Sequence, residues 1–364
     1  MAKNIALNNP CGRTQAYLFV HFTGDEESET DEQIYFAVSR DGLHWQDIRR
    51  RGDPVLTWSQ GEGGVRDPYI VRGPDDAFHI LATDLSIYHR GGWQEGMATV
   101  NGSTGLVIWD SDDLIHWGRP RLVDVARDIP GAGMAWAPEA CWDDEARQWI
   151  VFWATRAQNA DGGEAGEAPV ARVRGLANEL GDRTNMYYAT SPDLVTFSAP
   201  VKWIDQSSGV IDATMVKAPD GWWYRACKED QITLERTRNP YAPSWEVRRT
   251  DDDQAWSYLS SLTDLFGNGR YSSRYLEGPE LFIYNEDDRL SPDGRDMPFG
   301  LMCDQFGEAR GYLSFRSSDL SSRCEGDWAL ADYIDFGGMK KRHGAILAIT
   351  DEEYKRVRQL LTRQ

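Results

Sequence analysis

The 364-residue sequence predicts an all-β fold, a five-bladed β-propeller with four-stranded blades, from three observations. A strand-turn-aromatic motif recurs along the chain, a series of strand pairs alternates with it, and a helical pattern occurs only at the C-terminus. Four-stranded units repeated around an axis form a propeller. A β-sandwich followed by a second all-β domain would not explain five copies in phase. Because no Gly/Ser-rich linker divides the chain, we expect residues 1–364 to form a single domain.

The recurring motif is a strand that ends in Ser, followed by an acidic turn, a Leu and an aromatic residue. Its copies are residues 34–45, 106–117, 186–197 and 312–320, with a degenerate copy at 234–245. Apolar and polar residues alternate before each turn, which is typical of half-buried strands. In the degenerate copy, we expect Asn239-Pro240 to form the turn and Trp245 to return to the core.

The alternating strand pairs complete each unit. Each pair consists of a strand, a turn rich in Gly or Asp, and a second strand. The pairs span residues 67–83, 137–154, 211–226 and 277–303. The first unit, which begins at Ala16, lacks an innermost strand, and the run 343–349 can supply it and close the ring. A short helix is predicted over 351–361, with Thr350 as its N-cap.

Composition excludes several classes of function. The net charge of −19 is opposite in sign to that of a phosphate-backbone binder, so we expect no nucleic-acid partner. No run of 18 apolar residues exists, which predicts no membrane span, and the N-terminus lacks a secretory h-region, which predicts a cytoplasmic protein. The five cysteines have no CxxC spacing, and neither GxSxG nor HExxH occurs. The 15 Trp residues fit strand-rich cores and sites that stack on sugars.

Four carboxylates stand near the starts of the predicted innermost strands: Asp67 in VRDPYI, Glu139 in WAPEA, Asp212 in VIDATM and Glu277 in LEGPEL. Innermost strands line the channel of a propeller, so these side chains should converge. Clustered like charges raise each other's pKa and cost stability, which favours a role in acid–base chemistry. Taken singly, Asp67 could form a turn, Asp212 could cap one, and Glu277 could pair with Arg274.

The ordered set RDP, WAPE, VID and LEGP on a five-unit β chain resembles glycoside hydrolase family 43, over about residues 16–343. The resemblance implies a five-bladed propeller that hydrolyses arabinans, arabinoxylans, xylo-oligosaccharides or galactans with inversion. It implies that Asp67 is the base, that Asp212 tunes the acid, and that Glu277 is the general acid. The tuning aspartate of the family is usually followed by Pro, whereas Ala213 follows it here.

Inverting hydrolysis needs a carboxylic acid to protonate the leaving oxygen and a distant carboxylate to activate water. Asp67 and Glu277 on different blades would supply that separation. We expect ionised Asp212 to raise the pKa of Glu277, so that Glu277 stays protonated.

Five further residues are weaker candidates. Trp136 and Trp93 are expected to form sugar-stacking walls, the alternative being core packing. Glu139 is expected to bind substrate, and Arg274 to orient a carboxylate or sugar hydroxyl, the alternative being a surface ion pair. The resemblance implies that His343, in KRHG at the ring closure, holds a water or a structural calcium ion, the alternative being a loop histidine. No other cofactor is expected.

These features predict an inverting glycosidase that releases a terminal sugar from an oligosaccharide, with α-L-arabinofuranosidase first and β-xylosidase second. Galactofuranosidase or galactanase activity is the alternative within the family. A non-catalytic sugar-binding propeller, a retaining fructosidase and a mannoside phosphorylase are alternatives of other classes. The fructosidase pattern places an Asn-Asp-Pro triplet before RDP, and none precedes Asp67. The sequence leaves the oligomeric state open.

Overall fold

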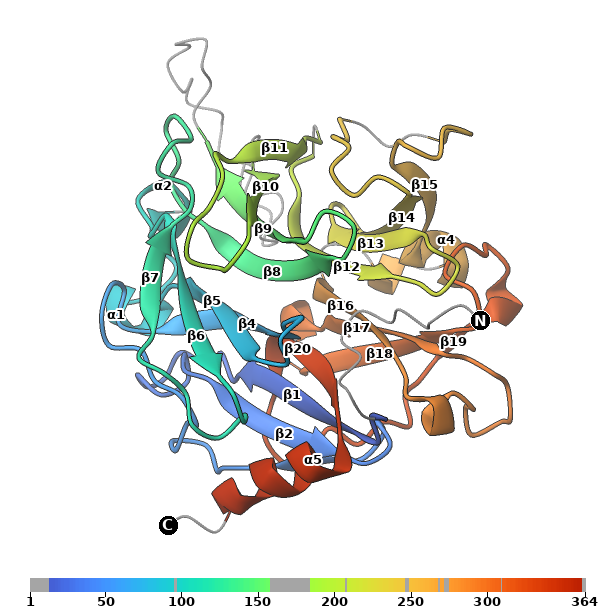
Figure 1. The fold of residues 1–364 in the computed structure, drawn as a ribbon, viewed down its shortest axis with the longest axis horizontal. Helices are drawn as coiled ribbons and strands as arrows, with labels where there is room; N and C mark the ends of the chain where they lie inside the picture. The colour runs from blue at the N-terminus through green and yellow to red at the C-terminus, as the bar shows by residue number, and fades with distance from the viewer. Residues whose placement is uncertain are drawn as a thin grey trace.

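The computed structural model describes residues 13–94, 97–157, 184–206, 208–245, 249–267, 269–271, 275–308 and 310–361. Five four-stranded antiparallel sheets surround a central axis, with one innermost strand of each sheet near the centre (Figure 1). The predicted five-bladed propeller is therefore confirmed.

The blades follow one another along the chain. The first contains β20 (Arg342–Ile349), β1 (Ala16–Phe22), β2 (Tyr35–Ser39) and β3 (Trp45–Asp47). The second contains β4 (Val65–Arg72), β5 (Phe78–Asp84), β6 (Gly105–Ser111) and β7 (Arg121–Asp124). The third contains β8 (Trp136–Asp143), β9 (Gln148–Arg156), β10 (Thr184–Ser191) and β11 (Val201–Ile204). The fourth contains β12 (Ile211–Lys217), β13 (Trp223–Lys228), β14 (Ile232–Thr237) and β15 (Ser257–Ser261). The fifth contains β16 (Glu277–Ile283), β17 (Phe299–Asp304), β18 (Tyr312–Ser317) and β19 (Trp328–Leu330).

The C-terminal strand closes the ring, as predicted. Strand β20 pairs antiparallel with β1, from Ala16 opposite Ile349 to Val20 opposite Ala345, and the two lie side by side in Figure 1. The first blade therefore joins the two ends of the chain in one sheet.

The helix that follows β20 is also confirmed. Helix α5 (Asp351–Val357) continues into a 3₁₀ segment (Arg358–Leu361), and Thr350 caps it in a reciprocal arrangement with Glu353. Glu353 also forms two 2.8 Å hydrogen bonds with Arg72, which fasten α5 to the second blade.

Helix is not confined to the C-terminus, contrary to the sequence prediction. Short segments between strands form α1 (Ile87–Arg90), α2 (Met97–Val100) and α4 (Leu262–Phe266). The 3₁₀ segments are Gly269–Tyr271, Glu286–Asp288, Phe306–Glu308 and Glu325–Asp327. Each is too short to produce a helical hydrophobic pattern, which explains why the sequence did not reveal it.

The recurring motif forms the same polar-capped turn in three blades. The hydroxyls of Ser39, Ser111 and Ser191 accept hydrogen bonds of 2.9, 3.0 and 2.8 Å from the backbone N–H three residues later. The donors of these hydrogen bonds, Gly42, Leu114 and Leu194, all have a left-handed φ. Both leucines are fully buried, so core packing offsets the strained backbone.

The degenerate copy of the motif was misassigned at its end. Trp245 is 43% exposed, whereas Trp256 is 2% exposed and immediately precedes β15. The connection after β14 is longer than in the other copies, so the aromatic residue that returns to the core comes later.

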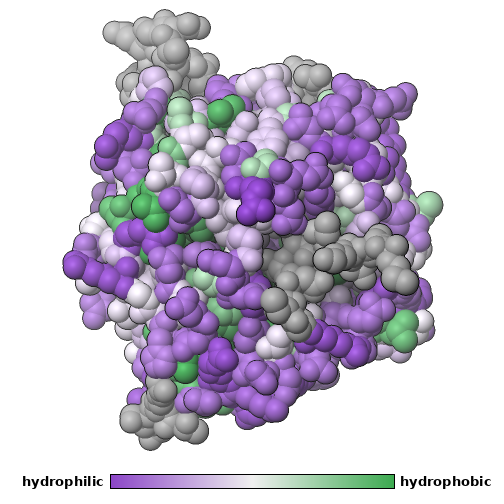
Figure 2. Space-filling view, viewed as in Figure 1, coloured by the Kyte–Doolittle hydropathy of each residue, from purple (hydrophilic) through white to green (hydrophobic). Residues whose placement is uncertain are grey.

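The buried apolar residues of the described chain form five clusters, each mainly between two neighbouring blades. Blade-to-blade packing therefore provides the core. The face shown in Figure 2 is mostly hydrophilic, with scattered apolar patches. Within the described residues, we find no helix that could cross a membrane. The cellular compartment stays a prediction.

Candidate active site

A β-bulge recurs at the same level of every innermost strand. In each, two consecutive residues face a single residue of the neighbouring strand. The bulged pairs are 67–68, 137–138, 212–213, 278–279 and 343–344. The first bulged residue has a φ near +50° in four blades: Asp67, Ala137, Asp212 and Gly278. Bulges re-aim side chains and are frequent beside active sites.

The positions of the bulges show that the four carboxylates do not occupy equivalent places on their strands, contrary to the sequence prediction. Asp67 and Asp212 both occupy the first bulged position, where β20 carries His343. Glu277 stands one residue before its bulge, and Glu139 directly after its own. The four acids therefore lie at three levels of the channel. Strand alternation alone does not show this, because each bulge inserts an extra residue into the strand.

Two of the predicted acids, Asp67 and Asp212, meet around a third predicted residue, His343. Its Nδ1 atom lies 3.4 Å from Asp67 Oδ1 and 4.0 Å from Asp212 Oδ2. The backbone N–H of Gly278 donates to Asp212 Oδ2 at 3.0 Å. A Cβ atom at residue 278 would lie 2.6 Å from the His343 ring, so the close approach requires glycine.

Sequence reasoning missed Thr83, on β5. Its hydroxyl donates to Asp67 Oδ2 at 2.9 Å and accepts from the backbone N–H of Ala137 at 2.8 Å. Thr83 therefore fixes the orientation of Asp67 and links the second blade to the third. A threonine within a strand carries no sequence signal for such a role.

Glu277 is held by a cation that the sequence analysis also missed. Arg342 Nη2 donates to Glu277 Oε1 at 2.8 Å, and Arg342 Nε donates to buried Asp304. Lys228 lies nearby, donates to the Leu276 carbonyl at 2.7 Å, and has a pKa that burial lowers. Each bulge is contained in a three-residue sequence, RDP, WAP, IDA, EGP or RHG, one from each innermost strand. Aligning these five sequences places Arg342, the first residue of RHG, at the same level as Glu277, the first residue of EGP.

The charges around His343 separate the two aspartates. Burial would raise the pKa of Asp67, but His343 and Arg66 outweigh burial and hold that pKa below its usual value. Burial, with the charges of Glu277 and Asp67, raises the pKa of Asp212 to about 6. The pKa of His343 is raised to about 9, because the neighbouring carboxylates outweigh its burial. At neutral pH, His343 is therefore a cation between the two aspartates.

A second group of acids lies directly after the bulges. Glu139 and Glu280 are each 3% exposed, and burial raises the pKa of both. Glu280 Oε1 accepts from the backbone N–H of Ile346 at 2.9 Å. One carboxyl oxygen of each acid, Oε2 of Glu139 and Oε2 of Glu280, is buried without a hydrogen-bond partner in the described structure. The sequence analysis missed Glu280, and a direct contact of Glu139 with substrate stays a prediction.

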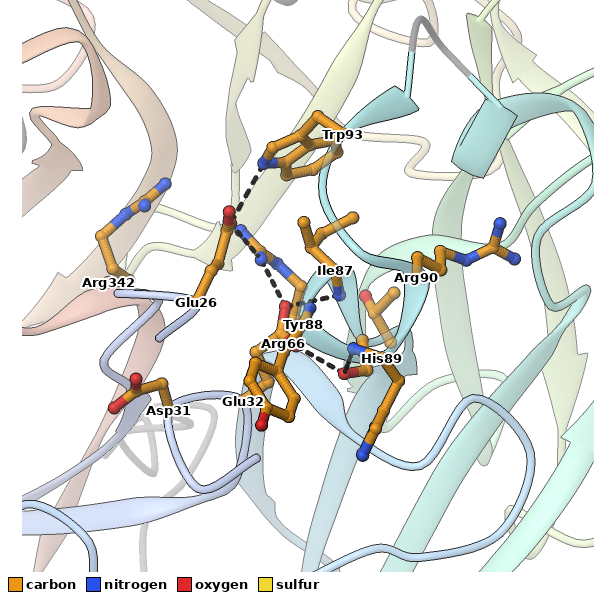
Figure 3. Close-up of polar contacts among 12 residues, drawn as sticks. Glu26, Asp31, Glu32, Arg66, Ile87, Tyr88, His89, Arg90, Trp93 and Arg342 are labelled. Carbon is orange, nitrogen blue, oxygen red and sulfur yellow. Dashed lines mark hydrogen bonds and ion pairs between the residues drawn. The ribbon is translucent and has the colours of Figure 1, made fainter. Parts of the chain in front are cut away.

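Two predicted aromatic residues lie together at the rim. Trp93 is 39% exposed and Trp136 is 7% exposed, and their rings meet edge to face with centroids 6.1 Å apart. Trp93 Nε1 donates to Glu26 at 3.1 Å, and the Arg66 guanidinium lies 5.0 Å from the Trp93 ring (Figure 3). Trp93 can therefore offer a face to a ligand, while Trp136 supports it. Arg274 lies outside the described residues.

Among the described residues, no group of three or more His, Cys, Asp and Glu is arranged to hold a metal ion. A protonated imidazole also lacks the lone pair that a metal ligand needs. The residues around His343 therefore provide no evident calcium cradle, and the metal stays a prediction.

A propeller with three partly or fully buried carboxylates and a histidine cation near its axis has the groups that acid–base hydrolysis requires. A family model described as a probable glycosyl hydrolase domain, related to glycosyl hydrolase family 43, matches residues 13–355. The chain belongs to this family, as the sequence motifs predicted.

The chain is 29% identical over 347 residues to an α-L-arabinofuranosidase of Bifidobacterium longum subsp. longum. The match covers 88% of this chain and 30% of that protein, so the chain spans less than a third of its relative.

Solved structures show weaker similarity. An α-L-arabinofuranosidase from Lactobacillus brevis has 17% identity and a TM-score of 0.46, covering 77% of this chain and 74% of that one. A thermostable family-43 glycoside hydrolase has 14% identity and a TM-score of 0.46, covering 79% and 78%. We draw no conclusion from scores below 0.5.

Proposed function

We propose that this protein is an inverting exo-acting glycoside hydrolase that releases a terminal α-L-arabinofuranosyl unit from an oligosaccharide. The arabinofuranosyl assignment rests on the similarity to a 29% identical α-L-arabinofuranosidase. No metal or organic cofactor is needed for the proposed steps.

The observation that carries the proposal is the placement of Asp67 and Glu277 on either side of β20. Arg342 contacts Glu277, and the next residue, His343, faces Asp67. Asp67 belongs to the second blade and Glu277 to the fifth, with the innermost strand of the first blade between them. Carboxyl groups that come from different blades can leave room for a water molecule on the face opposite the leaving group, as inversion requires.

In the proposed reaction, Asp67 accepts a proton from water as the water oxygen attacks the anomeric carbon. Its lowered pKa keeps it ionised at neutral pH, and Thr83 orients it. Glu277 gives a proton to the departing oxygen as the glycosidic bond breaks. Asp212 accepts a hydrogen bond from Gly278 N–H, and burial together with the charges of Glu277 and Asp67 raises its pKa to about 6. The proton from water ends on Asp67 and that of Glu277 on the released alcohol, so the two carboxyls must exchange protons with solvent before the next turnover.

A panel of nitrophenyl glycosides tests the substrate. We expect hydrolysis of the α-L-arabinofuranoside at a kcat/KM roughly tenfold or more above that of the β-xyloside, β-galactofuranoside and β-galactoside, the discrimination of about one favourable contact. Preference for the xyloside would replace the arabinofuranosyl assignment. Absence of hydrolysis across arabinofuranosides and arabino-oligosaccharides would favour a sugar-binding propeller.

A further inference from the structure

A rigid loop from the first blade reaches the rim of the site. The loop joins β1 to β2, and the backbone N–H groups of Thr23 and Gly24 donate to the Asp31 carbonyl at 3.2 and 3.0 Å. The Asp31 carboxylate accepts from the backbone N–H groups of Glu27 and Ser28 and pairs with Arg51. A Cβ atom at Gly24 would lie 3.0 Å from Arg342, so the loop packs against the arginine that holds Glu277.

This loop directs Glu26 toward Trp93. Glu26 has a left-handed φ of 58°, which a non-glycine residue keeps only where its contacts hold it. Its Oε1 atom accepts from Arg66 Nη1 at 2.7 Å and from Trp93 Nε1 at 3.1 Å (Figure 3). Both donors use Oε1, and no hydrogen bond to Oε2 is found among the residues that the structure describes. The side chain is 24% exposed, so one carboxylate oxygen is available to a ligand.

The segment that carries Trp93 is fixed independently. Buried Glu32 accepts from the backbone N–H groups of Ile87 and Tyr88 at 2.8 and 3.0 Å, and from Ser86 Oγ at 2.6 Å. Arg66 donates to Glu32 at 2.7 Å and so joins Glu32 to Glu26. Arg66 directly precedes Asp67 on β4. The contacts that hold Trp93 therefore lie beside the proposed base.

We infer that Glu26 and Trp93 form an aglycone subsite, which binds the neutral sugar unit that the reaction releases as the leaving group. The inference rests on the proposed function. The sugar ring stacks on Trp93, and one of its hydroxyl groups donates to Glu26 Oε2. Depth supports this position, because Trp93 is 39% exposed while Asp212 and Glu277 are 7% and 9% exposed. In an exo-acting enzyme the deep pocket holds the terminal sugar, and the rim holds its neighbour.

The variant Glu26→Gln tests the hydroxyl contact with little change in shape. The amide oxygen of glutamine can still accept from Arg66 and Trp93, while an NH₂ group replaces Oε2. For an arabino-oligosaccharide, we expect kcat/KM to fall by roughly tenfold to a hundredfold, mainly through KM, as for the loss of a hydrogen bond to a charged group. For the nitrophenyl arabinofuranoside, whose leaving group has no sugar hydroxyl, we expect a change below roughly twofold.

Two further variants complete the experiment. Glu27→Gln, in the same loop but paired with Arg51, should leave both substrates unaffected. Trp93→Ala should impair both, because a sugar and an aryl ring both stack on the indole. Thermal unfolding of each variant confirms that it is folded.

Equal losses on both substrates for Glu26→Gln, or no loss on the oligosaccharide, would overturn the subsite while leaving the proposed function intact. A wild-type protein that hydrolyses neither substrate would instead overturn the proposed function and the subsite with it.

Discussion

The channel holds two groups of largely buried acids that differ in their partners. Asp67, Asp212 and Glu277 lie among cations, with His343 between the aspartates and Arg342 on the glutamate. Glu139 and Glu280 lie one level away, each with a buried oxygen that has no hydrogen-bond partner in the described structure. Both groups come from innermost strands, and both are largely shielded from solvent.

The comparison shows that clustering of acids does not by itself mark a catalytic set. Burial without a counter-charge favours the neutral acid, as the raised pKa values of Glu139 and Glu280 indicate. Nearby cations keep Asp67 ionised despite burial, and an ionised carboxylate can accept a proton from water. We therefore propose that the first group carries out the chemistry and that Glu280 is structural, while contact of Glu139 with substrate stays a prediction.

The largest expected effect is that of Asp67→Asn. Without a proton acceptor, turnover should fall by roughly a hundredfold to ten-thousandfold, the usual contribution of a general base. Steady-state kinetics measures the fall, and circular dichroism confirms that the variant is folded. Near-wild-type activity in a folded variant would show that Asp67 is not the base. Glu280→Gln is the matched control in the other acid group, and it should change turnover by less than roughly tenfold.

The next largest effect should depend on the leaving group. Glu277→Ala removes the proposed proton donor, so it should slow release of a sugar alcohol much more than release of a nitrophenolate, which leaves without protonation. The loss should appear in kcat, unlike the KM effect expected for Glu26→Gln. If the leaving group matters only in Asp212→Asn, then Asp212, whose pKa is raised to about 6, is the donor.

A smaller effect should appear in the pH dependence of activity. His343 lowers the pKa of Asp67 through a hydrogen bond and its charge, so His343→Gln should raise that pKa. Because the base must be ionised, the acidic limb of the kcat/KM profile should move to higher pH. An acidic limb that stays in place would mean that His343 does not act on the base.

The smallest effect concerns the pH dependence of stability in the second group. The pKa of Glu280 is raised to about 8, so the folded state binds a proton that the unfolded state releases near pH 4.5. Stability from this group is therefore lost as pH rises from about 4.5 through about 8. Glu280→Gln cannot ionise, so its melting temperature should fall less than that of the wild type between pH 5 and pH 9, values chosen to span roughly this window. An equal fall in both proteins would contradict the assignment.

Most of the fold could be predicted from local sequence patterns. Alternation and turn residues located the blades, and the pairing of β20 with β1 followed from the missing strand of the first unit. Trp245 was misassigned because the connection that follows β14 is longer than the motif implies, and motif spacing cannot report an insertion.

The site was predicted only in part, because bulges set which residues share a level. Asp67, Asp212 and Glu277 stood out as acids in apolar or tightly turned contexts, and the structure places them in one channel. Thr83 carries no sequence signal for its role, and Glu280 stands out only once the bulges are aligned. Glu26 reaches the rim through a loop from another blade, a contact that only the tertiary structure supplies.

The measurement that tests the central claim most directly is proton NMR of the sugar during hydrolysis of an α-L-arabinofuranoside. In the proposed mechanism Asp67 activates a water molecule that attacks the anomeric carbon directly, so the β-anomer should appear first and the α-anomer only later by mutarotation. Early appearance of the α-anomer would mean retention, and it would contradict the assignment of Asp67 as a base that activates water.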